Sequence, residues 1–249
     1  YYRPSTYNVL RGGIDDQGNI KAWEHKLVAP SIAKSILPAM GGLAPQWIPD
    51  WMINAVIKGA GFLLENSDPT TSEGSVEVPY KIENIDVKHI FHDPGIPLGP
   101  WRSVGHSQNA FITESFIDEL ANLAEQDPYQ YRRSLLRAHQ DYLTVLDLVA
   151  EKSNWGDVEE GIYQGIAIHK SFGTIVSQVV DLELVNDKPK LKRVTCAVDC
   201  GTAVNPDQVR AQIESSVVFG LTAALKGEIN IEGGAVKESN FHDYQMLRM

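Results

Sequence analysis

The chain has 249 residues with 32 acidic and 22 basic side chains, which give a formal net charge of −10. The length suits one large domain or two small ones with a sizeable core, and 43% hydrophobic and 22% charged residues are typical of a globular protein. The acidic balance argues against broad nucleic-acid binding and against docking on an anionic membrane, and no apolar run is long enough to span a bilayer.

The N-terminal part is expected to begin with strands and to continue into short helices. Two β-leaning runs, 7–14 and 20–29, flank an Asp/Asn/Gly-rich turn at 15–19 and predict a β-hairpin. Residues 30–50 contain four prolines and a Gly-Gly pair, which favour a long loop or short helices. The apolar residues of 51–64 predict a short helix, which two glycines weaken.

A strand and three helices are predicted next. Residues 76–92 alternate in hydrophobicity, which predicts a strand. Its expected inward positions are Ile82, Ile85, Val87 and Ile90. Apolar residues recur at helical spacing over 111–124. Asp127-Pro128 is a helix-start signal, with the aspartate as N-cap and the proline in the first turn, and a third helix is expected over 143–152.

The C-terminal part is predicted to contain three strands, at 165–171, 174–185 and 191–199. Asn205-Pro206-Asp207 is the clearest helix start of the chain, because it combines an N-cap, a proline and an acid in the first turn. The expected apolar face of that helix is Val209, Ile213, Val217, Leu221 and Ala224. A closing hairpin is expected around Gly233-Gly234.

Strand-rich and helix-rich blocks segregate along the chain, so an α+β fold fits better than a βαβ alternation. We expect one domain over 1–249, with a β-rich part at 1–98 and a part with helices and a sheet at 99–249. Two cysteines, Cys196 and Cys200, are four positions apart in a predicted strand. Four strand steps span roughly 13 Å, beyond the roughly 4.4–6.8 Å between the Cα atoms of a disulfide. Two buried free thiols are therefore expected.

The first candidate site is the segment 97–109, which combines glycine and proline with Trp101, Arg102 and His106 and leads directly into a helix. Free backbone N–H groups at a helix start, next to an arginine, favour binding of an anion such as phosphate. The alternative is a structural loop in which Ser107 is an N-cap and Arg102 pairs with a surface carboxylate.

The second candidate site is the strand–turn–helix at 199–206, with Gln212 two turns into the helix. A ligand or another backbone could approach closely at the small residues that follow, which are Ser215, Ser216 and Gly220. The alternative is helix–sheet packing, with Asp199 capping locally.

A nucleophile elbow is a weaker interpretation of 105–109. Ser107 would be the nucleophile, with His106, His169 or His242 as its base, but Asn109 stands where the second glycine belongs. A serine hydrolase is therefore disfavoured, and His169 and His242 are expected to be packing or surface residues.

The two candidate sites together resemble the molybdenum hydroxylases of the xanthine dehydrogenase/aldehyde oxidase superfamily, in particular the large (β) chain of isoquinoline 1-oxidoreductase-like enzymes. The resemblance runs through 99–111, 114–121, 165–173, 198–207, 209–214 and 239–244, and the first hundred residues match more loosely. It implies a molybdopterin-binding domain of that type, with mixed sheets and packed helices.

The resemblance also implies cofactors and partners. These are molybdenum on molybdopterin cytosine dinucleotide, and 2Fe–2S clusters on a separate small iron–sulfur subunit. The substrate would be an N-heteroaromatic compound or an aldehyde, which the enzyme would hydroxylate, with the cofactor supplying the difficult chemistry. A homo-oligomer is compatible with it, whereas nucleic acid and a membrane span are not expected.

Residue by residue, Trp101 and Arg102 match an aromatic–arginine pair in the family loop that lies against the pterin, and Ser103 belongs to the same loop. Gln212 matches a glutamine that contacts the cofactor from the helix after the turn. The implied cofactor-binding residues are therefore Trp101, Arg102, Ser103 and Gln212. No residue is assigned as catalytic or as a protein ligand of the metal.

The chain departs from the family pattern in two respects. Ser215-Ser216 replace the usual paired glycines. The family's catalytic glutamate motif and two glycine-rich cofactor loops have no counterpart in 1–249. We therefore expect an internal segment of a longer catalytic subunit, inactive by itself and prone to self-association through exposed apolar surface. The alternative is a non-catalytic cofactor-binding or assembly module on the same scaffold.

Overall fold

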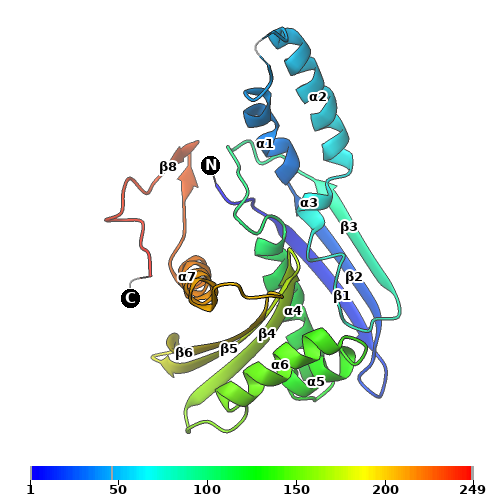
Figure 1. Cartoon of the computed structure of the whole chain (residues 1–249), viewed down its shortest axis with the longest axis vertical. Helices are drawn as coiled ribbons and strands as arrows, with labels where there is room; N and C mark the ends of the chain where they lie inside the picture. Colours follow the sequence, from blue (N-terminus) through cyan, green and yellow to red (C-terminus); the bar gives the residue numbers. More distant parts are fainter. Residues whose placement is uncertain (1, 46, 248–249) are drawn as a thin grey trace.

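The computed structural model describes residues 2–45 and 47–247, in which two three-stranded sheets lie on either side of a helical layer (Figure 1). The first sheet contains β1 (Tyr7–Ile14), β2 (Ile20–Ala29) and β3 (Ile85–Phe91). Strand β2 is central: it pairs antiparallel with β1 and parallel with β3. The predicted N-terminal hairpin is confirmed.

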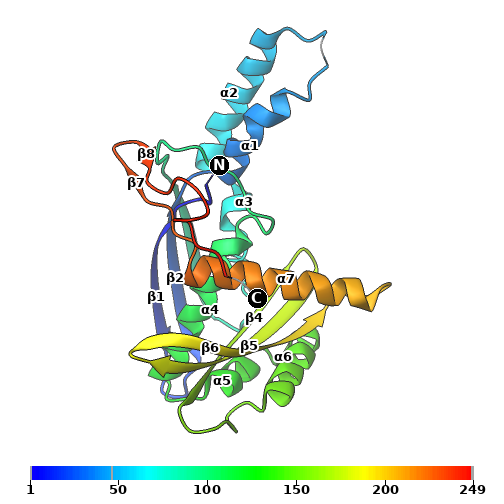
Figure 2. The ribbon, with the colours of Figure 1, turned by 90° about the vertical axis from the view of Figure 1, so that its left-hand side faces the viewer.

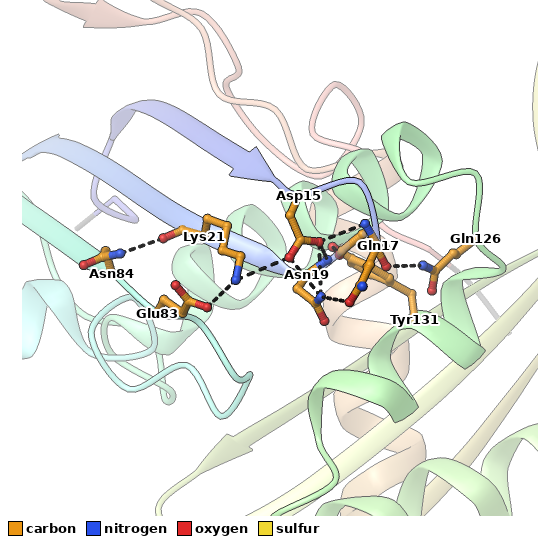
Figure 3. Close-up of polar contacts among 9 residues, drawn as sticks. Asp15, Gln17, Asn19, Lys21, Glu83, Asn84, Gln126 and Tyr131 are labelled. Carbon is orange, nitrogen blue, oxygen red and sulfur yellow. Dashed lines mark hydrogen bonds and ion pairs between the residues drawn. The ribbon is translucent and has the colours of Figure 1, made fainter.

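The turn between β1 and β2 is held by side-chain hydrogen bonds (Figure 3). Asp15 accepts hydrogen bonds from the backbone N–H groups of Asn19 at 2.8 Å and Gln17 at 3.0 Å. The hydrogen bonds from the Asn19 side chain and backbone lower the pKa of Asp15 to about 2. The Tyr131 hydroxyl donates to the Gly18 carbonyl at 2.9 Å, which ties this turn to the helical layer.

Three helices connect β2 to β3. They are α1 (Ile32–Gly41), α2 (Asp50–Asn66) and the single turn α3 (Pro69–Ser72). Helices α1 and α2 pack as a hairpin that projects from the body of the molecule (Figures 1 and 2). The expected short helices are confirmed, and α2 is somewhat longer than its predicted core.

The strand predicted over 76–92 is shorter than expected and its inward positions are partly wrong. Only β3 is extended, and Ile85 and Ile90 are 44% and 49% exposed. Parallel pairing places Val87 beside the buried His25 of β2, so that Val87 lies on the inner face and Ile90 on the outer face. The register to β2, which local alternation does not contain, decides the orientation.

The helical layer contains α4 (His106–Leu123), α5 (Pro128–Leu135) and α6 (Gln140–Ser153), close to the three predicted helices. Asp127 caps α5 as expected, because its carboxylate accepts the backbone N–H of Gln130 at 2.9 Å. Helix α4 contacts β1 of the first sheet and β4 of the second, so it bridges the two sheets. One hydrophobic core extends from β2 through these helices to the second sheet.

The second sheet is antiparallel, with the order β4 (Ile162–Ser171), β5 (Thr174–Val185) and β6 (Lys188–Asp199), and α6 packs on it. The three predicted strands are confirmed. Both cysteines are free, but only Cys196 is partly buried. The expectation of two buried thiols is wrong for Cys200, which is exposed because β6 ends one residue before it.

The chain continues with α7 (Pro206–Leu225) and a small hairpin of β7 (Ile231–Glu232) and β8 (Ala235–Val236), as expected. Asn205 caps α7 by accepting the Gln208 N–H at 3.2 Å. Helix α7 lies across the second sheet on the side opposite α6 (Figures 1 and 2). None of its residues is fully buried, and Ala224 of its predicted apolar face is exposed. No helix in the described part of the chain is long and apolar enough to cross a membrane.

Candidate cofactor-binding site

The loop before α4 is fixed by backbone contacts. Tyr2 and the loop exchange hydrogen bonds, from Tyr2 N–H to the Pro97 carbonyl and from Gly99 N–H to the Tyr2 carbonyl, both at 3.0 Å. A Cβ on Gly105 would lie 2.3 Å from the Thr70 carbonyl oxygen. Only glycine therefore lets the loop lie this close to α3.

Trp101 docks this loop onto α7. Its ring centroid lies 4.7 Å from that of Phe219 on α7, at an interplanar angle of 60°. The guanidinium carbon of Arg3 lies 4.7 Å from the Trp101 ring centroid, in the geometry of a cation–π contact. The loop, the N-terminal segment and α7 therefore meet at one aromatic side chain.

Arg102 and Gln212 connect the two predicted sites directly. Arg102 Nη1 donates a hydrogen bond of 2.9 Å to Gln212 Oε1, across 110 positions of sequence, and both residues are exposed. The alternative in which Arg102 pairs with a surface carboxylate is wrong, because Arg102 forms no ion pair within residues 2–45 and 47–247.

Ser103 lies at the same corner. Its hydroxyl is 2.8 Å from that of Ser107, and either oxygen can be the donor. The alternative in which Ser107 is the N-cap is wrong: α4 begins at His106, Gly105 occupies the cap position, and no side chain caps this end. Both serine hydroxyls therefore lie at the start of α4, an end that no side chain caps.

The turn before α7 is organised locally. Asp199 Oδ1 accepts the Gly201 N–H at 2.9 Å, which confirms the local capping, and Gly201 has a φ of +72°. Further along α7, Ser215 and Ser216 are exposed, and the Ser216 hydroxyl donates to the Ile213 carbonyl at 2.8 Å. This turn therefore positions Gln212 without contributing a side chain to the Arg102 contact.

A histidine pair behind the loop, in which His106 is buried and His169 half-buried, was not predicted from the sequence. His106 Nδ1 and His169 Nε2 are 2.9 Å apart, and a Cβ on Gly74 would lie 3.0 Å from the former atom. Burial, and to a lesser extent the charge on His106, lowers the pKa of His169 to about 4. The expectation that His169 is a packing residue is confirmed, and His242 lies at the surface.

A buried polar cluster anchors α4. Glu114 accepts hydrogen bonds from the Tyr80 hydroxyl at 2.6 Å and the Ile168 N–H at 2.9 Å. Arg132 Nε donates to Glu114 at 3.0 Å, and Arg132 Nη1 donates to Asp118 at 2.5 Å. Burial opposes the charge of Arg132, but the Glu114 and Asp118 carboxylates and Tyr80 together outweigh it and keep the pKa of Arg132 above its ordinary value. The cluster fixes the helix that follows the loop.

A cleft of ≈ 700 Å³ lies beside the loop, between the N-terminal segment, α4 and α7. Its lining includes Arg3, Trp101, Ser107, Gln108 and Gly220. Gln108 is only 8% exposed, and both polar atoms of its amide are buried without a hydrogen-bond partner in the described part of the chain. Burying an amide in this way lowers the stability of the fold by about 1–3 kcal/mol for each unsatisfied group, so it indicates a missing polar partner.

Comparison with known proteins identifies the class to which this arrangement belongs. The family model of the molybdopterin cofactor-binding domain matches residues 105–249, and the chain belongs to this family. The match includes α4, the second sheet and α7, and therefore Gln212, whereas Trp101, Arg102 and Ser103 lie just before it.

Two proteins of similar sequence are named as subunits of oxidoreductases. The chain is 34% identical over 154 residues to the beta subunit of isoquinoline 1-oxidoreductase from Brevundimonas diminuta, in an alignment that covers 59% of the chain and 20% of that protein. It is 26% identical over 263 residues to the B subunit of nicotinate dehydrogenase from Pseudomonas putida, covering 96% of the chain and 20% of that protein. The chain spans about a fifth of the length of these relatives.

A third relative and a solved structure complete the comparison. A membrane-bound aldehyde dehydrogenase of Gluconacetobacter polyoxogenes is 27% identical over 171 residues, covering 59% of the chain and 22% of that protein. The crystal structure of quinoline 2-oxidoreductase from Pseudomonas putida 86 superposes with a TM-score of 0.45 at 18% identity, covering 70% of this chain and 22% of that one.

The residues at the loop fit a molybdopterin. A pterin presents hydrogen-bond donors and acceptors on one edge, and its side chain carries a phosphate. The unpartnered Gln108 amide offers one donor group and one acceptor group, and the Arg102–Gln212 contact exposes further amide and guanidinium hydrogens. Arg3 and Arg102 supply positive charge that no carboxylate in the described residues neutralises.

Proposed function

We propose that the chain forms part of the molybdopterin site of an oxidoreductase, at the corner where the loop Trp101–Ser103 meets Gln212 of α7. The contact between Arg102 and Gln212 carries this proposal. Two exposed side chains from distant segments gain little stability from one hydrogen bond, about 0.5–1.5 kcal/mol at most, so a shared ligand is the better reason for their meeting.

Each of these residues has a distinct task in the proposed site. The Arg102 guanidinium would bind an anionic or carbonyl oxygen of the cofactor, and the Gln212 amide would bind a donor and an acceptor on the same edge. Trp101, held between Phe219 and Arg3, would form an apolar wall, and the Ser103 hydroxyl would complete the hydrogen bonding. The bound molybdenum centre would supply the redox chemistry.

The finer assignments follow from the resemblance and from the names of the relatives. We propose the cytosine dinucleotide form of the cofactor, an N-heteroaromatic compound or an aldehyde as substrate, and a small subunit with 2Fe–2S clusters as electron acceptor. The names isoquinoline 1-oxidoreductase, nicotinate dehydrogenase and aldehyde dehydrogenase support this substrate range.

A second function is a cofactor-binding or assembly module without catalysis. The exposed Ser215 and Ser216 favour it, because they stand where the family pattern has paired glycines and so add side chains to the surface of α7 near Gln212. In this case the cofactor would be held but no substrate would be oxidised.

Cofactor analysis tests the proposal. The product of the complete reading frame is purified with its co-expressed partners, and molybdenum and pterin are quantified for the wild type, Arg102→Ala and Gln212→Ala. Arg11→Ala is the matched control, since Arg11 is an exposed arginine paired with Glu24 on the first sheet. Near-stoichiometric molybdenum that falls severalfold in both site variants supports the proposal, and a wild type without molybdenum or pterin contradicts it. Dye-linked substrate oxidation then separates the enzyme from the module.

A further inference from the structure

The loop before α4 is strained at Val104. This residue has a φ of +49°, in the left-handed region, which a β-branched side chain rarely adopts. Backbone strain of this kind persists only where the surrounding structure holds the chain on both sides. Val104 follows Arg102 and Ser103 of the proposed cofactor site and precedes α4, so the loop needs an anchor at each end.

The two anchors come from different parts of the fold. On the side away from α4, Trp101 packs on Phe219 of α7. On the helix side lies His106, the first residue of α4, whose Nδ1 is 2.9 Å from Nε2 of His169 on β4. No side chain caps this end of the helix. The histidine contact therefore helps to fix the point at which the loop enters α4.

Helix α4 is attached to β4 at two points. Glu114, in the middle of the helix, accepts the Ile168 N–H at 2.9 Å and belongs to the buried cluster with Arg132. His106 lies about two turns earlier and contacts His169, the next residue of β4. Because Glu114 keeps the helix on the sheet, the histidine contact can open without unfolding α4, and its opening affects the end that carries the loop.

The histidine contact is closely packed. A Cβ on Gly74 would lie 3.0 Å from His106 Nδ1 and 3.1 Å from His169 Cε1, and Gly74 has a φ of +80°. The Phe172 ring stands at 65° to the His106 ring, with centroids 5.8 Å apart. Strand β5 places the uncharged Val176 opposite His169. The two rings are therefore held against each other by uncharged neighbours.

The charged groups on the surrounding elements do not pair with either ring. Glu114 of α4 is bound to Arg132, and Lys170 of β4 lies 4.0 Å from Asp141 of α6. Glu73, next to the turn over the rings, does not form a cluster with the two histidines within residues 2–45 and 47–247. The contact therefore depends on the hydrogen that the two imidazoles share.

We propose that the His106–His169 hydrogen bond positions the strained loop for cofactor binding, and that it does so only while the two facing nitrogens share one hydrogen. This inference rests on the proposed function, because Arg102 and Ser103 are the groups that the loop presents. With one hydrogen between them, one ring donates and the other accepts. When both rings are protonated, each facing nitrogen carries a hydrogen, the two N–H groups repel each other, and Val104 can relax.

Acid should therefore open the loop before it unfolds the protein. Burial, and to a lesser extent the charge on His106, lowers the pKa of His169 to about 4 in the closed structure, whereas a solvated histidine titrates near 6.5. Between these values the open loop binds a proton that the closed loop does not. The equilibrium constant for opening should therefore rise by up to about tenfold for each pH unit as the pH falls.

Hydrogen exchange of the cofactor-free full chain measures this opening. The Val104 N–H donates to the Trp101 carbonyl at 3.0 Å, and the Ser107 N–H donates to the Val104 carbonyl at 3.3 Å. Both amides are protected only while the loop is closed. Amides in 176–180 of β5, which pairs with strands on both sides, report global unfolding instead.

Three variants separate positioning from packing. His169→Gln supplies an amide that can donate and accept but does not titrate, whereas His169→Leu fills the space without a hydrogen bond. His242→Gln removes an exposed histidine and is the matched control. From pH 7 to pH 5, loop protection should fall about tenfold or more in the wild type and in His242→Gln, and stay constant in His169→Gln. In His169→Leu it should be low at both pH values, with β5 protected in all four proteins.

Molybdenum content of the protein purified with its partners gives the second readout. It should fall severalfold in His169→Leu and be retained in His169→Gln. Loop protection that is independent of pH in the wild type, or equal in His169→Leu and His169→Gln, would overturn the inference whatever the molybdenum content. A loop that behaves as expected in a wild type without molybdenum would support the role of the histidine contact and contradict the proposed function alone.

Discussion

Arg102 on the loop before α4 donates a 2.9 Å hydrogen bond to Gln212 on α7, and this contact joins the two segments that the sequence marks as candidate sites. Trp101 supports the same junction by packing on Phe219. Because Arg102 and Gln212 are exposed, their hydrogen bond contributes little to the stability of the fold, and its main effect is to position the two groups on the surface.

The Arg102–Gln212 pair is therefore predicted to affect ligand binding and not folding. Arg102→Ala and Gln212→Ala should each change the free energy of unfolding by less than about 1 kcal/mol, as is usual for exposed hydrogen bonds. Urea denaturation of the cofactor-free protein measures this. A loss of more than about 2 kcal/mol in either variant would show that the contact is structural.

Replacing Gln108 with leucine is predicted to preserve or raise the stability of the fold but to lower cofactor retention. Gln108→Leu removes two buried polar atoms that lack partners, so the cofactor-free protein should be as stable as the wild type or more stable. Molybdenum content should nevertheless fall severalfold if the amide binds the cofactor. Unfolding and metal analysis of the same preparation check both effects, and a destabilised variant with full molybdenum content would contradict the account.

Gly105 is predicted to be indispensable for the loop. Gly105→Ala would place a Cβ 2.3 Å from the Thr70 carbonyl oxygen, a backbone atom that cannot move aside cheaply, and should cost more than about 2 kcal/mol. Gly220→Ala on α7 is the control, since no atom lies within 4 Å of its new Cβ, and it should stabilise the helix by roughly 0.5–1 kcal/mol. Equal effects of the two substitutions on thermal unfolding would refute the steric argument.

The Glu114–Arg132 cluster is predicted to be the main polar determinant of stability near the site. Arg132→Met leaves the buried Glu114 carboxylate without its cation and should cost about 3–5 kcal/mol. Arg133→Ala, which removes the exposed pair with Asp147, should cost less than about 1 kcal/mol. Guanidinium denaturation of both variants distinguishes them, and a mild effect of Arg132→Met would mean that water or Tyr80 compensates for the lost charge.

Two histidines are predicted to make the fold labile in mild acid. Burial lowers the pKa of His25 to about 4, and burial together with the His106 charge does the same for His169, whereas an unfolded histidine titrates near 6.5. Between pH 6.5 and about pH 4, both histidines are protonated in the unfolded chain but neutral in the folded one. The free energy of unfolding therefore falls as the pH is lowered through this range. The slope is up to about 1.4 kcal/mol per pH unit for each histidine.

Denaturation curves at pH 7.5, 6 and 5 measure this slope. His169→Gln should lower this slope by up to about 1.4 kcal/mol per pH unit, the contribution of one proton. Above pH 7 neither histidine should make the free energy of unfolding depend on pH. The Asp15 carboxylate, whose pKa is lowered to about 2, affects the pH dependence only in more acidic solution, because its stabilisation is fully present above the ordinary value of 3.8 and is lost as the pH falls toward 2. An unchanged free energy of unfolding between pH 7 and 5 would rule out the assignment.

Local signals in the sequence predict the secondary structure well where they are self-contained. The Asp127-Pro128 and Asn205-Pro206 helix starts are confirmed, because an N-cap and a proline act within one turn. The inward assignment of Ile90 is wrong, because the parallel register between β2 and β3 places Val87 on the inner face and Ile90 on the other. Ile85 lies on the same face as Val87 but is 44% exposed. Long-range pairing overrides local alternation.

The site itself was predictable only in part. Residue chemistry identifies Arg102 and the start of α4, but the approach of Gln212 spans 110 positions and was implied only by the family resemblance. The His106–His169 contact and the unpartnered amide of Gln108 depend on packing between α4, β4 and neighbouring segments. No spacing rule contains such contacts, although His106 lies within the segment that the sequence singles out.

The most direct test of the central claim is a crystal structure of the purified molybdenum-containing protein, with anomalous data collected at the molybdenum edge. The account predicts pterin density in contact with Arg102 and Gln212, with the metal on the same side of α7. Cofactor density bound elsewhere, with the Arg102–Gln212 hydrogen bond facing only solvent, would contradict it.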